Sequence, residues 1–443
     1  MVRTLKIIGG VLLTIFIGTA ILLFVAPPDL LRVGTNYAAK IVCSSVFVSG
    51  RDAEEALAVD VQAPGHPVLG FINVEVDEDT QTVRTQLLSI FAPAVSQHRA
   101  GLGCTNTHET TLSDASIAPM DPLDNALWPD GNQVAASLDP NVADVLRDEA
   151  LVGPGYRAVV VVKDGRIVGQ TYADGFDAAM PLLGWSMTKT VTAAIIGSLI
   201  QSQDMALDDT MTDVFPAWTA DDRARITLSD MLGMANGLAW NEGYGSVSDV
   251  TEMLYLSDDM AGFAASKAAE AAPQTVFNYS SGTSTALSRV WQAKLGDAAL
   301  DYPNQALFAP LGMTSAVMET DSTDTFVGSS YMYATARDWA RFGQFLLQDG
   351  IWEGQRILPE GFTDWMFGPV SASGGAYARG HLWRQAPGRD SAFEDAVWLQ
   401  GHDGQSVGIF PSRNMVVVRL GLTPSRLGYS PVPLAEALIA ALE

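Results

Sequence analysis

The chain of 443 residues is too long for one small hydrophobic core, so at least two packed units are expected. Hydrophobic residues make up 48% and charged residues 17% of the chain, which is typical of a globular protein and argues against disorder. The formal net charge of −24 gives a surface that repels phosphate backbones, so nucleic-acid binding is not expected.

The first element is an uncharged apolar run from Ile7 to Ala26, long enough to cross a bilayer as a helix. Arg3 and Lys6 precede it, which favours a cytoplasmic N-terminus and an exported remainder. A cleaved signal peptide usually has a shorter apolar region and a small-residue cleavage site. We therefore expect residues 1–28 to anchor the protein in the bacterial inner membrane, with the catalytic domain in the periplasm or outside. Secretion after signal cleavage is the alternative.

The chain has two cysteines, Cys43 and Cys104, and both follow the apolar run. In an exported protein an even cysteine count favours a disulfide, and the alternative is two reduced, buried cysteines. A bridge would tie down the N-terminal extension, residues 29–150. Within it, "FINVEVDEDTQTVRTQLL" alternates apolar and polar residues around an acidic turn and predicts a hairpin.

From Tyr156 onward the character of the chain changes. "YRAVVVVKDGRIVGQTYADG" predicts two strands joined at Asp164-Gly165. The run Val159 to Val162 is too continuously apolar for a half-exposed edge, which indicates a covered sheet. The apolar helix "VTAAIIGSLI" follows, and because apolar residues cover most of its circumference it is expected to be buried.

The remainder alternates helices and strands. Residues 204 to about 330 are predicted to be mostly helical, with Ser229 as an N-cap. An amphipathic helix is expected from Tyr333 to Gly350, then a hairpin turning at residues 411–414 and a final helix in "PVPLAEALIAALE". The two groups of strands could join in one antiparallel sheet, with the helical stretch as a second lobe.

The stretch "GWSMTKTV" contains the one S-x-x-K match in the chain, Ser186 and Lys189. A serine hydroxyl needs a base within hydrogen-bond reach to become a nucleophile, and positions i and i+3 share a helix face. Burial would lower the lysine pKa and make the neutral amine available. The alternative is a pair of ordinary helix residues.

Two further motifs follow along the chain. In "FNYSSG", the Tyr279 phenol could pass a proton to a leaving group; alternatively Tyr279 packs in a core while Ser280 or Ser281 caps the next helix. In "QGHDGQSVGIF", His402, Gly404 and Gln405 lead into a strand. Gly404 could let the substrate backbone approach closely, and the N–H that follows it could donate to an oxyanion. The alternative is a polar turn before a strand. The five histidines show no metal-ligand spacing, so no metal is expected.

In this order the three motifs resemble the serine β-lactamase and penicillin-binding protein superfamily, with S-x-x-K, then Y-x-N or Y-x-S, then K-T-G or H-x-G on a strand. The likeness runs from about Tyr156 to the C-terminus. Four segments resemble its class C β-lactamase-related branch and, within that branch, the 6-aminohexanoate-dimer hydrolase group. They are "LLGWSMTKTVTAA", "ITLSDMLGMANGLAWNEGY", "FNYSSGTSTALS" and "YATARDWARFGQFLLQDGIWEGQRILPEGF". "CSSVFVSGRD" and "GLGCTN" resemble N-terminal stretches of exported members.

The resemblance implies an α+β fold of the β-lactamase/transpeptidase type over residues 151–443, with an antiparallel sheet flanked by helices and a mostly helical lobe at about 204–330. It makes Ser186 the acyl-forming nucleophile, Lys189 its base and Tyr279 a partner in proton transfer. The backbone N–H groups of Ser186 and Gln405 would form the oxyanion hole. Tyr244 matches a substrate-contacting tyrosine of amide-hydrolysing relatives, and a surface loop aromatic is the alternative.

The sequence departs from true β-lactamases at two motif positions. His402 stands where they usually have lysine, and Ser281 stands where they usually have asparagine. Both replacements resemble the esterase and amidase members of the superfamily. We therefore expect a serine hydrolase of small esters or amides that needs no cofactor. A D-amino-acid peptidase or weak β-lactamase is one alternative, and a non-catalytic envelope binding protein is another. The sequence leaves the natural substrate and the oligomeric state open.

Overall fold

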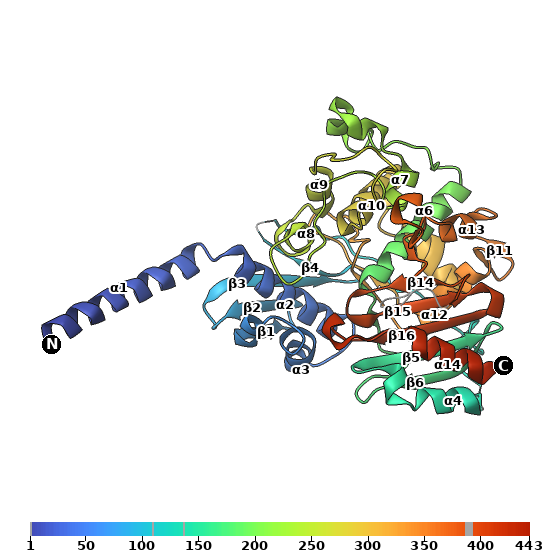
Figure 1. The fold of residues 1–443 in the computed structure, drawn as a ribbon, viewed down its shortest axis with the longest axis horizontal. Helices are drawn as coiled ribbons and strands as arrows, with labels where there is room; N and C mark the ends of the chain where they lie inside the picture. Colours follow the sequence, from blue (N-terminus) through green and yellow to red (C-terminus); the bar gives the residue numbers. More distant parts are fainter. Residues whose placement is uncertain (1, 109, 136–137, 386–392) are drawn as a thin grey trace. The chain divides into compact units, whose positions relative to one another are not determined.

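A computed structural model describes residues 2–108, 110–135, 138–385 and 393–443 (Figure 1). The chain divides into two compact units. Unit 1 comprises Met1–Arg99, Cys104–Leu112 and Gly243–Asp258, and unit 2 comprises Ala100–Gly103, Ser113–Glu242 and Asp259–Glu443. A segment from the middle of the sequence thus belongs with the N-terminal region, which local sequence patterns did not indicate. The predicted domain boundaries at residues 28 and 150 stay predictions.

Unit 1 is built on a four-stranded sheet in the order β1-β2-β3-β4, against which α2 packs. The predicted hairpin is confirmed as β1 and β2, with Val76 opposite Val83. The elements of this unit are α1 (Val2–Val25), α2 (Asp29–Phe47), α3 (Ala53–Ala56), η1 (Leu57–Gln62), η2 (Pro67–Phe71), β1 (Ile72–Asp77), β2 (Thr82–Leu87), β3 (Phe91–Arg99), β4 (Gly103–Asn106) and α8 (Asp249–Leu256).

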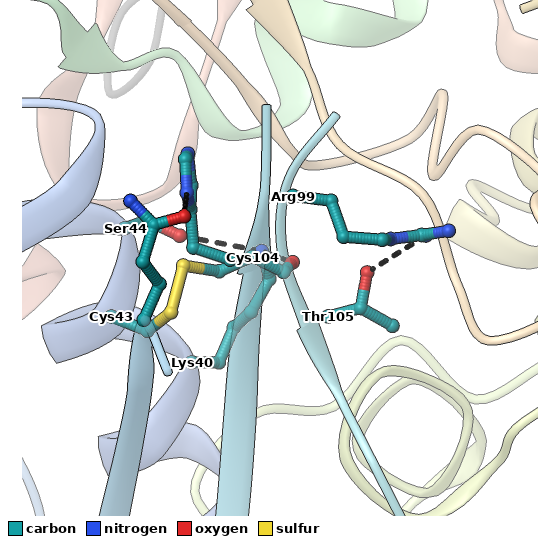
Figure 2. Close-up of a disulfide and its surroundings, with 8 residues drawn as sticks. Lys40, Cys43, Ser44, Arg99, Cys104 and Thr105 are labelled. Carbon is teal, nitrogen blue, oxygen red and sulfur yellow. Dashed lines mark hydrogen bonds between the residues drawn. A yellow bond between two sulfur atoms is a disulfide. The ribbon is translucent and has the colours of Figure 1, made fainter. Parts of the chain in front are cut away.

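A disulfide between Cys43 of α2 and Cys104 of β4 joins the helix to the sheet (Figure 2). Both cysteines are fully buried. The Lys40 ammonium lies beside the bridge and donates hydrogen bonds to the Cys104 carbonyl oxygen at 2.6 Å and to Ser44 Oγ at 3.4 Å. This buried cation therefore has polar partners, as a charge removed from water requires.

Helix α1 is the one helix in the described part of the chain that is long and apolar enough to cross a membrane, over Lys6–Val25. Its large apolar side chains, among them Leu12, Ile15 and Phe24, are exposed to the surroundings and not packed in a core. Length and composition therefore suit either a membrane anchor or a signal sequence.

Unit 2 contains a seven-stranded antiparallel sheet in the order β12-β13-β14-β15-β16-β5-β6, so the two predicted groups of strands do join. Its strands are β5 (Tyr156–Lys163), β6 (Arg166–Tyr172), β12 (Tyr377–Ala378), β13 (Leu382–Trp383), β14 (Val397–Gln400), β15 (Ser406–Phe410) and β16 (Met415–Gly421). Smaller sheets are β7-β9-β8 (Leu182–Leu183, Met332–Ala334, Val317–Met318) and β10-β11 (Ile351–Trp352, Gln355–Arg356).

The helices of unit 2 complete the α+β fold. They are α4 (Pro140–Leu146), α5 (Glu149–Val152), α6 (Thr188–Gln201), α7 (Leu228–Leu232), α9 (Met260–Ala265), α10 (Ser281–Leu295), α11 (Ala309–Leu311), α12 (Ala336–Leu347), α13 (Phe362–Phe367) and α14 (Val432–Leu442), with short helical turns η3–η11 between them. Most of α6 is buried, as its apolar circumference predicts.

Both faces of the large sheet are covered, which explains the unbroken valine run of β5. Val159 and Val161 pack in one cluster with residues of α4 and α14. Helix α12 contacts β5, β15 and β16, and Gly343 allows close approach because a side chain there would meet Val416. All four valines from Val159 to Val162 are fully buried, so the expectation of a covered sheet is confirmed.

Two local predictions are wrong. Tyr333 was expected at the start of a helix, but it lies in β9 because residues 332–334 pair with neighbouring strands, and α12 begins after the N-cap Thr335. The N-cap of α7 is Thr227 and not Ser229. The Thr227 side chain accepts the Asp230 N–H while the Asp230 carboxylate accepts the Thr227 N–H, and this reciprocal pair starts the helix two residues before Ser229.

Candidate active site

The predicted nucleophile lies where a short turn, η3 (Trp185–Met187), runs into the buried helix α6. Ser186 is partly exposed, whereas its neighbours Trp185 and Met187 are buried. Trp185 has a positive φ of 49°, a strained conformation for a bulky residue. Gly184 is required just before it, since a Cβ there would lie 2.2 Å from the Trp339 ring. The chain is thus bent sharply so that the serine reaches solvent.

The Lys189 amine lies one helical turn after Ser186 and is fully buried. Its Nζ is 2.9 Å from Ser186 Oγ, 3.0 Å from Ser281 Oγ and 2.9 Å from the Ser329 carbonyl oxygen. Three acceptors suit the three protons of an ammonium. When the lysine is neutral, two protons still serve Ser281 and Ser329, and the lone pair is left for the Ser186 hydroxyl.

Burial lowers the pKa of Lys189 from its ordinary 10.5 to about 8, although the nearby Glu242 charge raises it in the opposite direction. A substantial fraction of the amine is therefore neutral near pH 8, whereas an exposed lysine would be almost fully protonated. This is the state that a general base requires.

A carboxylate that the sequence analysis missed, Glu242, stands on the far side of Ser281. Ser281 Oγ donates a hydrogen bond to Glu242 Oε1, and the Ser281 N–H donates to Oε2 at 2.8 Å. The Trp240 indole N–H also donates to Oε2, at 2.5 Å. Glu242 sits in the stretch already noted for Tyr244, but no spacing rule connects a loop glutamate to a serine about forty positions later.

The helix cap near this site is Ser280, whose side chain accepts the Thr283 N–H at 3.0 Å. The expectation that Ser280 or Ser281 caps this helix is thus confirmed for Ser280, and Ser281 does not take the capping role. It lies instead between Lys189 and Glu242. Donation of its proton to the carboxylate leaves its lone pairs to accept from Lys189.

The Tyr279 ring lies beside the same amine, with Lys189 Nζ 4.9 Å from the ring centroid. It packs against Tyr377 and Trp383, at ring-centroid distances of 5.9 and 5.4 Å. Burial raises the pKa of the Tyr279 phenol, the Glu242 charge raises it further, and a hydrogen bond with Ser186 opposes both. The phenol is therefore protonated at neutral pH and can donate or relay a proton.

The predicted oxyanion donors are the backbone N–H groups of Ser186 and Gln405. In the described part of the chain, neither N–H donates to a backbone carbonyl oxygen outside its own helical turn. The Gln405 side chain is occupied with Gly421, accepting its N–H at 2.8 Å and donating to its carbonyl oxygen. The end of β14 can approach the serine segment because Gly401 lacks a side chain; a Cβ there would lie 2.3 Å from the Gly184 carbonyl oxygen.

The loop that carries Gln405 is held by a second group that the sequence analysis missed, the fully buried Arg419. Its guanidinium donates to the carbonyl oxygens of Gly404 at 3.0 Å, Val152 at 3.1 Å and Pro154 at 3.1 Å. Gly404 has a φ of 86°, which a glycine adopts at little cost. The His402 ring lies 5.7 Å from the Trp185 ring, beside the nucleophile.

Tyr244 belongs to unit 1, whereas the residues above belong to unit 2. It is 37% exposed, and its role as a substrate contact stays a prediction. Within the described residues, no group of three or more His, Cys, Asp or Glu side chains could hold a metal ion.

A cavity of about 430 Å³ shares Ala235, Val370 and Ala372 with the hydrophobic cluster that contains Tyr279. Polar and charged side chains line it as well, namely Ser229, Asp230, Gln274, Ser371 and Arg379. The cavity thus combines an apolar wall with polar and charged groups of both signs.

An antiparallel sheet covered by helices on both faces, with a Ser-Lys pair at the start of a buried helix, defines the β-lactamase/transpeptidase-like fold. The sequence model of the β-lactamase family matches residues 150–427, more than half of the chain. The protein therefore belongs to the β-lactamase family. A comparison with curated proteins gives no match.

Solved structures support the fold. A protein from Bacillus anthracis assigned as a 6-aminohexanoate-dimer hydrolase is 22% identical, with a TM-score of 0.58, covering 75% of this chain and 90% of its own. A penicillin-binding protein homologue from Caulobacter crescentus is 15% identical, with a TM-score of 0.54 and coverages of 70% and 99%. A family VIII carboxylesterase is 14% identical, with a TM-score of 0.54 and coverages of 70% and 98%.

Proposed function

We propose that the protein is a serine hydrolase that cleaves small esters or amides through an acyl-enzyme on Ser186. The observation that carries this proposal is the fully buried Lys189 amine, with its pKa lowered to about 8, at 2.9 Å from Ser186 Oγ. A buried lysine is costly unless it is used or paired. In the neutral amine, two N–H protons serve Ser281 and Ser329, and the lone pair is left for the Ser186 proton.

In the acylation step, Ser186 Oγ attacks the substrate carbonyl carbon and its proton passes to Lys189 Nζ. The carbonyl oxygen becomes an oxyanion, which the N–H groups of Ser186 and Gln405 stabilise. Collapse of the intermediate breaks the ester or amide bond, and the Tyr279 phenol delivers a proton to the leaving oxygen or nitrogen. The phenol regains its proton from Lys189. Water then attacks the acyl-enzyme by the same proton path and releases the acid and free Ser186.

Glu242 gives the proton path its direction. Because the carboxylate accepts the Ser281 hydroxyl proton, Ser281 can only accept from Lys189 and does not compete with Ser186 for the amine lone pair. Glu242 is thus a positioning residue that acts through Ser281. Its charge also keeps the Lys189 pKa from falling further, so that the amine remains basic enough to take the serine proton.

The small ester or amide substrate is supported by His402 and Ser281, which replace the lysine and asparagine usual in β-lactamases. Structural relatives described as a carboxylesterase and as an aminohexanoate-dimer hydrolase point the same way. A D-amino-acid peptidase or weak β-lactamase is the second candidate, favoured by the similar fold of a penicillin-binding protein homologue.

We further propose that α1 anchors the protein in the bacterial inner membrane, with the catalytic unit exported. The supporting observations are the apolar span Lys6–Val25 and the cations that precede it in the sequence. The disulfide between Cys43 and Cys104 agrees with an oxidising compartment.

The test measures hydrolysis of a short p-nitrophenyl ester, a linear 6-aminohexanoate dimer and a chromogenic cephalosporin by the detergent-solubilised full chain. Ser186→Ala is the matched control, expected to fold normally and to lose turnover on every substrate. Serine-dependent turnover of the ester or dimer with little on the cephalosporin is the expected result. Cephalosporin turnover would move the protein to the cell-wall branch. A Ser186→Ala variant that keeps most of its activity would refute the acyl-enzyme.

A further inference from the structure

The turn between β2 and β3 in unit 1 displays apolar side chains to the surroundings. Leu88 is 55% and Ile90 54% exposed, and Phe71, which is 59% exposed, lies beside them because the Leu88 N–H donates to its carbonyl oxygen at 2.9 Å. We call Phe71, Leu88 and Ile90 the apolar tip. Three large exposed apolar side chains at one point of a surface mark an interaction site more often than chance exposure.

The backbone of the turn is strained in order to present these residues. Leu88 and Ser89 have φ values of 52° and 62°, in the left-handed region that hairpin turns usually fill with Gly, Asn or Asp. A leucine there costs conformational energy and gains no burial. Strain that is retained without a folding benefit points to a function of the displayed side chains.

The two ends of this small sheet differ in chemistry. At the opposite end, the β1–β2 turn carries Asp77, Glu78 and Asp79, all exposed. Because β2 runs from one turn to the other, the sheet has one apolar end and one acidic end. A bilayer with anionic lipids would attract the first end and repel the second.

The apolar tip lies at the end of the sheet from which α1 departs. The Thr35 carbonyl oxygen of α2 accepts a hydrogen bond from the Thr85 hydroxyl at 2.7 Å, near the apolar end of β2. At the other end of α2, Phe47 stacks on His98, whose backbone N–H donates to the Gln81 carbonyl oxygen beside the acidic turn. Helix α2 therefore begins on the side of the apolar tip. Only three residues separate its start at Asp29 from the end of α1 at Val25, and α1 itself contacts β3.

We infer that the apolar tip inserts into the boundary between headgroups and acyl chains of the bilayer that α1 spans. It would hold unit 1 upright at the membrane surface, with the acidic turn facing water. This inference rests on the proposed anchorage by α1. A lipid surface suits the tip better than a protein partner, because three protruding side chains beside a membrane span resemble an interfacial anchor.

The test uses the full chain in proteoliposomes with one spin label at a time. Both native cysteines form the disulfide, so a single added cysteine is labelled specifically under non-reducing conditions. The labelled variants are Leu88→Cys and Ile90→Cys in the tip, Glu78→Cys at the acidic end as the matched control, and Thr14→Cys within α1. Electron paramagnetic resonance then compares collisions with oxygen, which concentrates in lipid, and with Ni(II)EDDA, which stays in water.

We expect oxygen to dominate at Leu88→Cys and Ile90→Cys, with Ni(II)EDDA accessibility several-fold lower than at Glu78→Cys. A Phe71→Ser change in the Ile90→Cys background should move the label toward water. If Thr14→Cys is embedded but the tip labels are as accessible to Ni(II)EDDA as Glu78→Cys, the inference is overturned while the anchorage stands. Water exposure of Thr14→Cys would refute the anchorage itself. Spin–spin broadening at the tip would show that a second copy covers it and would also overturn the inference.

Discussion

Replacement of Glu242 by glutamine tests the proposed direction of proton transfer. Two hydrogen bonds in series, from Lys189 to Ser281 and from Ser281 to Glu242, place the carboxylate about 5 Å from the amine. Two unit charges at about 5 Å interact by about 3 kcal/mol at an effective dielectric constant of 20. Loss of the Glu242 charge should therefore lower the pKa of Lys189 further.

The acidic limb of the pH profile of kcat/KM reports this pKa, because only the neutral amine can take the Ser186 proton. In the wild type the limb should have its midpoint near pH 8. In Glu242→Gln it should move to lower pH, by about two units if the full 3 kcal/mol is lost. The plateau should also fall roughly 100-fold, since the glutamine NH₂ can donate to Ser281 and reverse the hydrogen bonds that reserve the lone pair.

The matched control is Trp240→Phe, which removes one hydrogen bond to Glu242 but keeps its charge. Its acidic limb should stay near the wild-type position even if kcat decreases. Stopped-flow hydrolysis of the most reactive ester between pH 5 and 10 measures both variants. A Glu242→Gln enzyme whose limb stays near pH 8 while only its plateau falls would refute the electrostatic argument and leave Glu242 a purely structural role.

Three further predictions concern stability and fit. The pKa of Lys189 is about 8 in the folded protein and 10.5 when unfolded, so the unfolded chain binds more protons between these two pH values. The unfolding free energy should therefore rise with pH across this window by about 3 kcal/mol relative to Lys189→Met. Denaturant unfolding that gives both proteins the same pH dependence would contradict this. Gly401→Ala places a Cβ 2.3 Å from the Gly184 carbonyl oxygen, two residues before the nucleophile, so kcat/KM should fall at least tenfold. The control Gly70→Ala, whose Cβ meets nothing within 4 Å, should leave kcat/KM unchanged. Replacing Cys43 and Cys104 by alanine removes a disulfide that spans 61 positions and should lower the unfolding free energy of unit 1 by about 2–4 kcal/mol in chemical denaturation. An unchanged denaturation midpoint would show that the disulfide does not stabilise this unit.

Local patterns were sufficient for much of the fold. Period-two alternation located the β1–β2 hairpin, and the continuous valine run of β5 indicated a sheet covered on both faces. These inferences succeed because burial on one or two faces of a strand imposes a residue pattern within a few positions. The predicted cap Ser229 failed because the reciprocal capping pair of Thr227 and Asp230 starts α7 two residues earlier.

For the site, the sequence by itself determined the Ser186–Lys189 pair, since three positions on a helix suffice to bring the two side chains together. It also singled out Tyr279 and Gln405, through motifs in a recognisable order. Glu242 and Arg419 were decided only by the tertiary structure. Each acts across a long stretch of chain on a backbone group or hydroxyl, and such contacts leave no local periodicity. A glutamate in a loop and an arginine in a strand look ordinary in the sequence, because only folding brings the first to Ser281 and the second to the carbonyl oxygens of Gly404, Val152 and Pro154.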